Sequence, residues 1–239
     1  MATERLPKTS RLIVKDAGII TIDVPHLAPE AGKHPGFDPG FERFHDTWTK
    51  LRVFGLVDYE WIILLDSDMI FLRPMDELFE MELPEKDWIA AVPACICNPF
   101  KVKNYPKDWY VDGPSTWRRF PTDGLKNRTP ANCTISRQDR FATLYSPPIP
   151  SSDGPRTEHL LNSGLVILQP SREQMDHIVH VSNTSPAVQG FRFPDQELIA
   201  HVYRNRWRSL PWWCNAFQTA RAVHQDIWAD VDVRLIHYT

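Results

Sequence analysis

Two carboxylates interrupt an apolar run in Tyr59-Glu-Trp-Ile-Ile-Leu-Leu-Asp66-Ser67-Asp68-Met-Ile-Phe-Leu-Arg-Pro74. The residues before Asp66 are apolar and β-branched and include a tryptophan, which is typical of a buried strand. On an extended chain Asp66 and Asp68 point to the same side. A polar island inside an apolar stretch is costly to bury without a compensating partner. Oxygen donors at a strand end suit Mg²⁺ or Mn²⁺. We therefore expect a metal site, although Asp-x-Asp alone is also common in surface turns.

Length and charge restrict the class of protein. The chain has 239 residues, enough for one well-cored domain over 1–239. It carries 27 Lys and Arg against 30 Asp and Glu, with a net charge of −3 and no basic run, which argues against nucleic acid or an anionic membrane as partner. No stretch resembles a membrane span or a secretory signal, so we expect a cytoplasmic protein with small-molecule partners.

The cysteines do not form a recognisable framework. Cys95, Cys97, Cys133 and Cys214 are too few and too scattered for a set of disulfides. The pair Cys95-Ile-Cys97 has the spacing of a strand rather than of a zinc ribbon. We expect reduced thiols in the core.

The apolar periodicity predicts alternating strands and helices. Strands are expected at 19–24, before Asp66, at 88–92, at 160–168 and at 233–237, and a short extended stretch at 207–213. Helices are expected at 41–54, 170–181 and 195–203. The stretch 99–158 lacks a sustained period and is expected to be an irregular insertion. This alternation favours an α/β layered sheet, whose ligands bind beyond the carboxyl ends of strands.

The ordered motifs resemble glycosyltransferase family 8, the glycogenin and galactinol synthase group. The matching positions run along most of the chain: Lys50, Leu65-Asp66-Ser67-Asp68, Asp76-Glu-Leu-Phe79, Asn162-Ser163-Gly164, Gln169-Pro-Ser171, Asp195-Gln196, Leu210-Pro211, Asn215 and Ile236-His237. The resemblance implies a GT-A-like layered sheet with helices on both faces, Rossmann-like and incomplete at its N-terminus.

The resemblance also implies a chemistry. Family members are retaining transferases that move a hexose from a nucleotide-sugar, here expected to be a UDP-sugar, to a hydroxyl acceptor. The implied cofactor is Mn²⁺ or Mg²⁺, bound by Asp66, Asp68 and His237. His237 alone could equally be a satisfied histidine at a strand end. The implied partners are the sugar donor and the acceptor, and a homodimer is left open.

The remaining site residues follow from the same resemblance. Asp195 and Gln196 are expected to be catalytic, near the transferred sugar. The expected substrate-binding residues are Lys50, Asn162, Ser163, Gly164, Asp66 and Ser67. Asp195 could instead cap a helix after Pro194, and Lys50 could simply extend from a helix into solvent.

Departures from the family pattern leave two alternatives open. The family's first strand and helix, which hold the nucleotide base, have no counterpart before about Ile13, and the usual Lys-Pro-Trp does not follow His237. A non-catalytic relative that binds a sugar or a partner is the first alternative. Because Asp-x-Asp also serves phosphoryl transfer, another metal-dependent phosphoryl-transfer enzyme is the second.

Overall fold

The computed structural model describes residues 1–98, 102, 103, 105, 106, 109, 117–119, 128–130 and 133–238. Much of the predicted insertion at 99–158 therefore lies outside the described residues. Its described part after residue 132 is irregular and contains short 3₁₀ helices, η5 (Ile135–Arg137) and η6 (Arg156–His159). Within the described ranges, no helix combines the length and apolar character that a membrane span requires.

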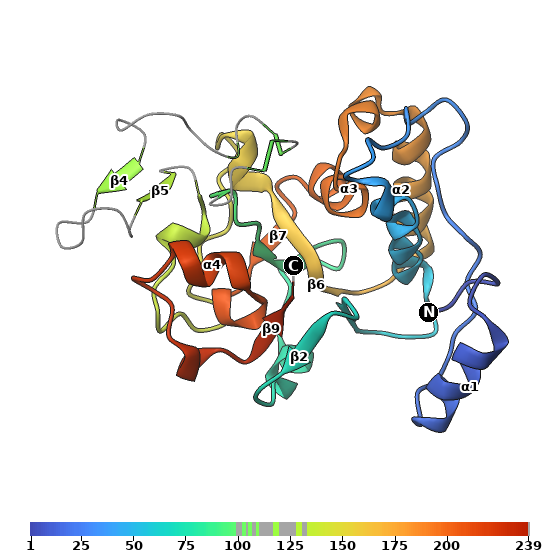
Figure 1. Cartoon of the computed structure of the whole chain (residues 1–239), viewed down its shortest axis with the longest axis horizontal. Coiled ribbons are helices and arrows are strands. Elements are labelled where there is room, and N and C mark those ends of the chain that lie inside the picture. The colour runs from blue at the N-terminus through green and yellow to red at the C-terminus, as the bar shows by residue number, and fades with distance from the viewer. Residues whose placement is uncertain are drawn as a thin grey trace. The chain divides into compact units, whose positions relative to one another are not determined.

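The chain divides into two compact units (Figure 1). The first comprises Met1–Glu60 and Pro170–Val202, and the second comprises Trp61–Gln169 and Tyr203–Thr239. Each unit is thus assembled from two separate stretches of the sequence. A single domain over 1–239 stays a prediction.

The first unit is helical. Its helices are α1 (Lys8–Asp16), η1 (Glu42–Phe44), η2 (Thr47–Gly55), α2 (Arg172–Thr184), η7 (Pro186–Gly190) and α3 (Pro194–Val202). The Ser171 hydroxyl caps α2 by accepting the backbone N–H of Gln174 at 3.1 Å, as expected of an N-cap serine. The apolar face of η2 is buried, and both α2 and α3 contact it. The helix predicted at 41–54 forms as two 3₁₀ segments.

The predicted strand at 19–24 is wrong. The chain forms α1 before this segment, and an isolated bridge joins Asp23 to Ala2. Ile19 and Ile20 are exposed. β-Branched residues favour a strand only where a neighbouring strand and a half-buried surface receive them, and a single bridge does not supply that surface.

The second unit contains a four-stranded sheet. The strand order is β1 (Ile62–Leu65), β6 (Leu161–Leu168), β3 (Ile89–Pro93) and β7 (Trp207–Ser209). β6 pairs antiparallel with both β1 and β3, whereas β3 and β7 are parallel. β3 is buried throughout and β6 nearly so, in keeping with their continuous apolar sequences.

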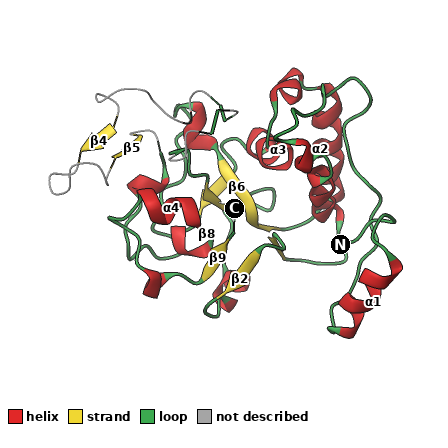
Figure 2. Ribbon diagram, in the orientation of Figure 1, coloured by secondary structure: helices red, strands yellow, loops and turns green. Residues whose placement is uncertain are grey.

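A second sheet adjoins the Asp66–Asp68 segment. It has the order β2 (Met69–Phe71), β9 (Leu235–His237) and β8 (Ala216–Phe217), and α4 (Gln218–Val223) follows β8. Figure 2 shows β2, β9 and β8 among the strands of this unit. Further short elements of this unit include η3 (Asp76–Glu80), η8 (Trp212–Cys214), η9 (Asp230–Asp232) and the antiparallel pair of β4 (Trp117–Arg119) and β5 (Arg128–Pro130). The α/β class is confirmed.

Candidate metal centre

The Asp66–Asp68 segment is a turn that joins β1 of the four-stranded sheet to β2 of the three-stranded sheet. The backbone N–H of Asp66 donates to the Gly164 carbonyl at 2.9 Å, which extends the pairing of β1 with β6. The Tyr238 N–H donates to the Asp68 carbonyl at 3.0 Å, which extends the pairing of β2 with β9. The two carboxylates therefore converge because a turn is held at both ends. The expectation that they share one side of an extended strand is wrong.

His237, at the end of β9, completes a group of three possible ligands. Its Nε2 lies 3.4 Å from Asp68 Oδ1 and 3.8 Å from Asp66 Oδ2. One ligand atom from each of the three residues lies within 4.8 Å of the others. The His237 side chain is 2% exposed, whereas Asp66 and Asp68 are 24% and 51% exposed. The centre thus has a fixed imidazole at its base and carboxylates that a ligand from solvent can reach.

A chain of hydrogen bonds determines which nitrogen of His237 faces the carboxylates. The Gly164 backbone N–H donates to Asn162 Oδ1 at 2.9 Å, which fixes the orientation of that amide. Asn215 then donates its Nδ2 to the same oxygen at 2.8 Å. This leaves Asn215 Oδ1 to accept from His237 Nδ1 at 2.9 Å. His237 Nδ1 is therefore the donor, and in the neutral imidazole the Nε2 lone pair points to Asp66 and Asp68.

Gly164 on β6 is needed for the close approach of the imidazole. A Cβ at this position would lie 2.4 Å from His237 Cε1 and 2.7 Å from Nδ1. It would also lie 2.8 Å from Asn162 Oδ1. The glycine therefore makes room for both the ring and the amide that orients it.

These residues fit a divalent ion. Neighbouring ligands in an octahedral Mg²⁺ or Mn²⁺ site are about 3 Å apart for metal–oxygen distances near 2.1 Å. The two His237 Nε2 contacts, at 3.4 Å to Asp68 and 3.8 Å to Asp66, are wider than this spacing. Two carboxylates and a neutral imidazole form a mixed oxygen and nitrogen donor set that suits Mn²⁺. The hydrogen bond from Nδ1–H to Asn215 is the outer contact that metal-bound histidines commonly make.

The first unit brings together two of the other predicted residues. Lys50 Nζ on η2 lies 2.7 Å from Asp195 Oδ2 on α3, and the side chains are 24% and 6% exposed. At the start of α3, Glu197 Oε2 accepts the backbone N–H groups of Arg192 and Phe193. Asp195 is buried in this ion pair, and Gln196 beside it is also buried. Sequence reasoning did not foresee this pairing.

The predicted residues Asn162, Ser163 and Gly164 are consecutive on β6, but they do not act alike. Asn162 and Gly164 contact the His237 network. Ser163 is buried and, by the alternation of a strand, faces the opposite side. Ser67 lies between the two carboxylates in the turn. The structure therefore groups Asn162 and Gly164 with Asp66, Asp68 and His237, whereas the strand alternation puts Ser163 on the other face of the sheet.

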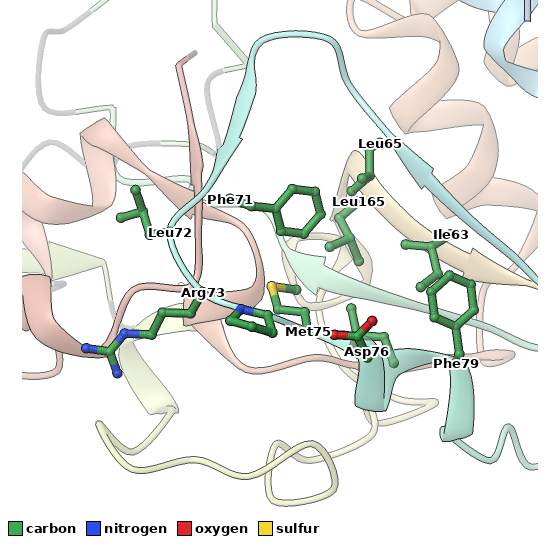
Figure 3. Close-up of a pocket in the computed structure, with 11 residues that line it drawn as sticks. Ile63, Leu65, Phe71, Leu72, Arg73, Met75, Asp76, Phe79 and Leu165 are labelled. Carbon is green, nitrogen blue, oxygen red and sulfur yellow. The ribbon is translucent and has the colours of Figure 1, made fainter. Parts of the chain in front are cut away.

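An apolar pocket of about 500 Å³ lies in the second unit, and the sequence analysis did not predict it (Figure 3). Its lining is mostly apolar and includes residues from both sides of the Asp66–Asp68 turn: Ile63, Leu65, Phe71, Leu72, Arg73, Pro74, Met75, Asp76, Leu78, Phe79 and Leu165. In Figure 3 the Arg73 guanidinium points away from the apolar side chains. Exposed Phe71 and Phe79 belong to this lining.

Known proteins resemble the chain at low identity, and no protein-family model matches it. Galactinol synthase 1 of Solanum lycopersicum is 22% identical over 233 residues, which cover 98% of this chain and 58% of that protein. An uncharacterised protein of Acanthamoeba polyphaga mimivirus is 25% identical over 172 residues, which cover 70% of this chain and 43% of that protein. The chain thus spans about half the length of these curated relatives.

A solved structure shares the fold. The crystal structure of the glycosyltransferase GlyE of Streptococcus pneumoniae TIGR4 matches with a TM-score of 0.50 and 14% identity. The match covers 97% of this chain and 44% of that one. The expected resemblance to glycosyltransferase family 8, and the GT-A-like α/β fold that it implies, are confirmed.

Proposed function

We propose that this chain transfers a sugar from a nucleotide-sugar to a hydroxyl acceptor, using a divalent ion bound by Asp66, Asp68 and His237. The convergence of these three side chains, with the His237 lone pair directed at the carboxylates, is the observation that supports the proposal most strongly. The similarity to galactinol synthases supports the same class of reaction. A UDP-hexose donor and retention of configuration remain proposals that rest on the resemblance.

The chemistry required at the metal centre is charge stabilisation. A bound Mn²⁺ or Mg²⁺ would neutralise the negative charge that develops on a departing diphosphate. The chain contributes preorganisation, because the turn is held by Gly164 and Tyr238 and the imidazole is held by Asn215. Groups that are already oriented need little rearrangement as charge develops.

The buried pair in the first unit has a separate proposed role. The resemblance assigns Asp195 and Gln196 to the transferred sugar and Lys50 to sugar or phosphate. The contact of Lys50 with Asp195 holds both charged groups in defined positions. A carboxylate held in this way can accept hydrogen bonds from sugar hydroxyls, and its orientation depends on the lysine.

Binding of Mn²⁺ tests the proposal without any substrate. The full chain is titrated with Mn²⁺, and the loss of the free-ion electron paramagnetic resonance signal is recorded. D66N, D68N and H237A should each weaken binding by at least tenfold. D58N, which removes an exposed carboxylate outside the group, is the matched control. Equal Mn²⁺ affinity in D68N, H237A and the unchanged chain would refute the proposed centre.

Turnover separates transfer from the two alternatives. The chain is incubated with a panel of UDP-sugars, with and without Mn²⁺, and release of UDP and free sugar is measured. The proposal predicts Mn²⁺-dependent, sugar-selective release that D68N abolishes, with the anomeric configuration retained. Equal cleavage of nucleotides that lack a sugar would favour phosphoryl transfer. Binding of Mn²⁺ and UDP without turnover would favour the non-catalytic relative.

A further inference from the structure

A second group of metal-binding side chains lies in the second unit, away from the Asp66–Asp68 turn in sequence. Cys95 and Cys97 follow β3, Cys133 lies far along the chain, and His224 directly follows α4. His224 Nε2 lies 3.3 Å from the sulfur of Cys95, 3.5 Å from that of Cys97 and 3.6 Å from that of Cys133. The four ligand atoms lie within 4.8 Å of one another.

Hydrogen bonding alone does not explain this arrangement. One imidazole nitrogen has either one lone pair or one proton, so it forms one good hydrogen bond. His224 Nε2 nevertheless has three sulfurs at nearly equal distances. The other ring nitrogen, Nδ1, is buried and has no hydrogen-bond partner in the described part of the chain. The three thiols are therefore the polar groups that the ring faces.

The distances match a tetrahedral zinc site. With Zn–S near 2.3 Å and Zn–N near 2.0–2.1 Å, a tetrahedron places nitrogen roughly 3.6 Å from each sulfur. The observed range of 3.3–3.6 Å is close to this value. All four cysteines are free thiols, and Cys97, Cys133 and His224 are fully buried. A cation would satisfy three thiols and an imidazole that, in the part of the chain that the structure describes, face one another.

We propose that Cys95, Cys97, Cys133 and His224 bind one structural Zn²⁺. Three thiolates and one imidazole complete a tetrahedron and leave no open position for a substrate, which is the pattern of structural zinc. Soft sulfur donors also distinguish this site from the carboxylate and imidazole centre proposed for Mn²⁺. We expected all four cysteines to be reduced core thiols. Under this proposal only Cys214, which is buried outside the group, has that role.

The site joins segments that are distant in the sequence. Cys95 and His224 are 129 residues apart, and Cys133 and His224 are 91 apart. A bound ion would tie the end of β3 and the residues around Cys133 to the end of α4. Because the unfolded chain lacks this preformed site, the free energy of zinc binding adds to the stability of the fold.

Metal analysis of the purified full chain tests the assignment. The protein is produced in zinc-supplemented medium, purified without chelators and analysed by mass spectrometry of the elements. We expect about one zinc per chain. C133S and H224A should reduce the zinc content at least fivefold. C214S, which alters a buried cysteine outside the group, should keep it, as should D68N, which alters the other centre.

A second measurement does not depend on the folding of a variant. A mercurial reagent that modifies thiols is added to the unchanged protein, and zinc release is followed with a coloured chelator. Release of one zinc per chain as three thiols react supports the site. A protein without metal, thiol modification that releases no zinc, a disulfide among these cysteines or iron in place of zinc would each overturn the assignment. So would zinc that D68N removes and C133S retains.

Discussion

The imidazole of His237 packs directly over the backbone of Gly164, with no space for a side chain between them. A Cβ on residue 164 would lie 2.4 Å from Cε1 of the ring. The same glycine donates its N–H to Asn162 and accepts the N–H of Asp66. One backbone position therefore supports a carboxylate, the imidazole and the amide network that orients it.

The substitution G164A should damage the metal centre. The added methyl group must displace the His237 ring or shift β6, and such overpacking costs about 1–3 kcal/mol of stability. We expect Mn²⁺ affinity to fall tenfold or more, as measured by titration. G190A is the matched control, because a Cβ at Gly190 meets nothing within 4 Å. Unchanged Mn²⁺ affinity in G164A would show that the ring position is irrelevant to binding.

Replacing Asn215 should weaken metal binding without removing a ligand. N215A deletes the acceptor of the His237 Nδ1 proton, and loss of such an outer contact typically costs 10–100-fold in metal affinity. N215D keeps the acceptor for His237 but loses the donor to Asn162 Oδ1, so it should lose less affinity than N215A. The comparison is made by Mn²⁺ titration of both variants. Equal losses in N215A and N215D would argue that Asn215 only fills space.

Several elements could be predicted from the sequence because local signals were strong. The strands at 88–92 and 160–168 are uninterrupted apolar runs, and they form β3 and β6. The helix expected from Pro170 forms as α2, with Ser171 as its cap. Asp66, Asp68 and His237 were expected together only because they fit an ordered family pattern, and the structure does bring them together.

The remaining features depend on contacts between distant segments. The sequence around Lys50 and around Asp195 contains no pattern that predicts the ion pair between them. The spacing Cys95-Ile-Cys97 resembles a strand, and its further ligands lie at Cys133 and His224, beyond any motif window. The failed strand at 19–24 had the right composition but no partner strand. The composition of a segment gives its local preference, whereas the ion pair, the cysteine group and the absent strand each depend on residues that are distant in the sequence.

The ion pair of Lys50 and Asp195 should contribute measurably to stability. K50M leaves the nearly buried Asp195 carboxylate without its lysine, and breaking a buried pair costs about 3–5 kcal/mol, less here because Lys50 is partly exposed. We expect a loss of about 2 kcal/mol in urea unfolding, with K50M/D195N less destabilised than the sum of the single variants. The exposed pair of Arg5 and Asp46 is the control, and R5M should cost under about 1 kcal/mol. Additive effects of K50M and D195N would disprove the coupling.

Acid should destabilise the fold partly through His159. Burial lowers the pKa of this imidazole below its usual value, and the charge of Arg204 lowers the pKa further, while Glu158 opposes the shift. The folded state therefore takes up a proton less readily than the unfolded state. The stability from neutral His159 is present above the unfolded pKa of about 6.5 and is lost as the pH falls below that value.

The variant H159Q isolates this contribution. Its urea midpoint should fall less between pH 7.5 and pH 5 than that of the unchanged chain, because glutamine has no proton to accept in this range. Acid also protonates the thiolate ligands proposed for zinc, but that loss is common to both proteins and cancels in the comparison. H177Q, at an exposed position on α2, controls for the loss of a histidine as such. Parallel pH dependence of H159Q and the unchanged chain would remove His159 from the explanation.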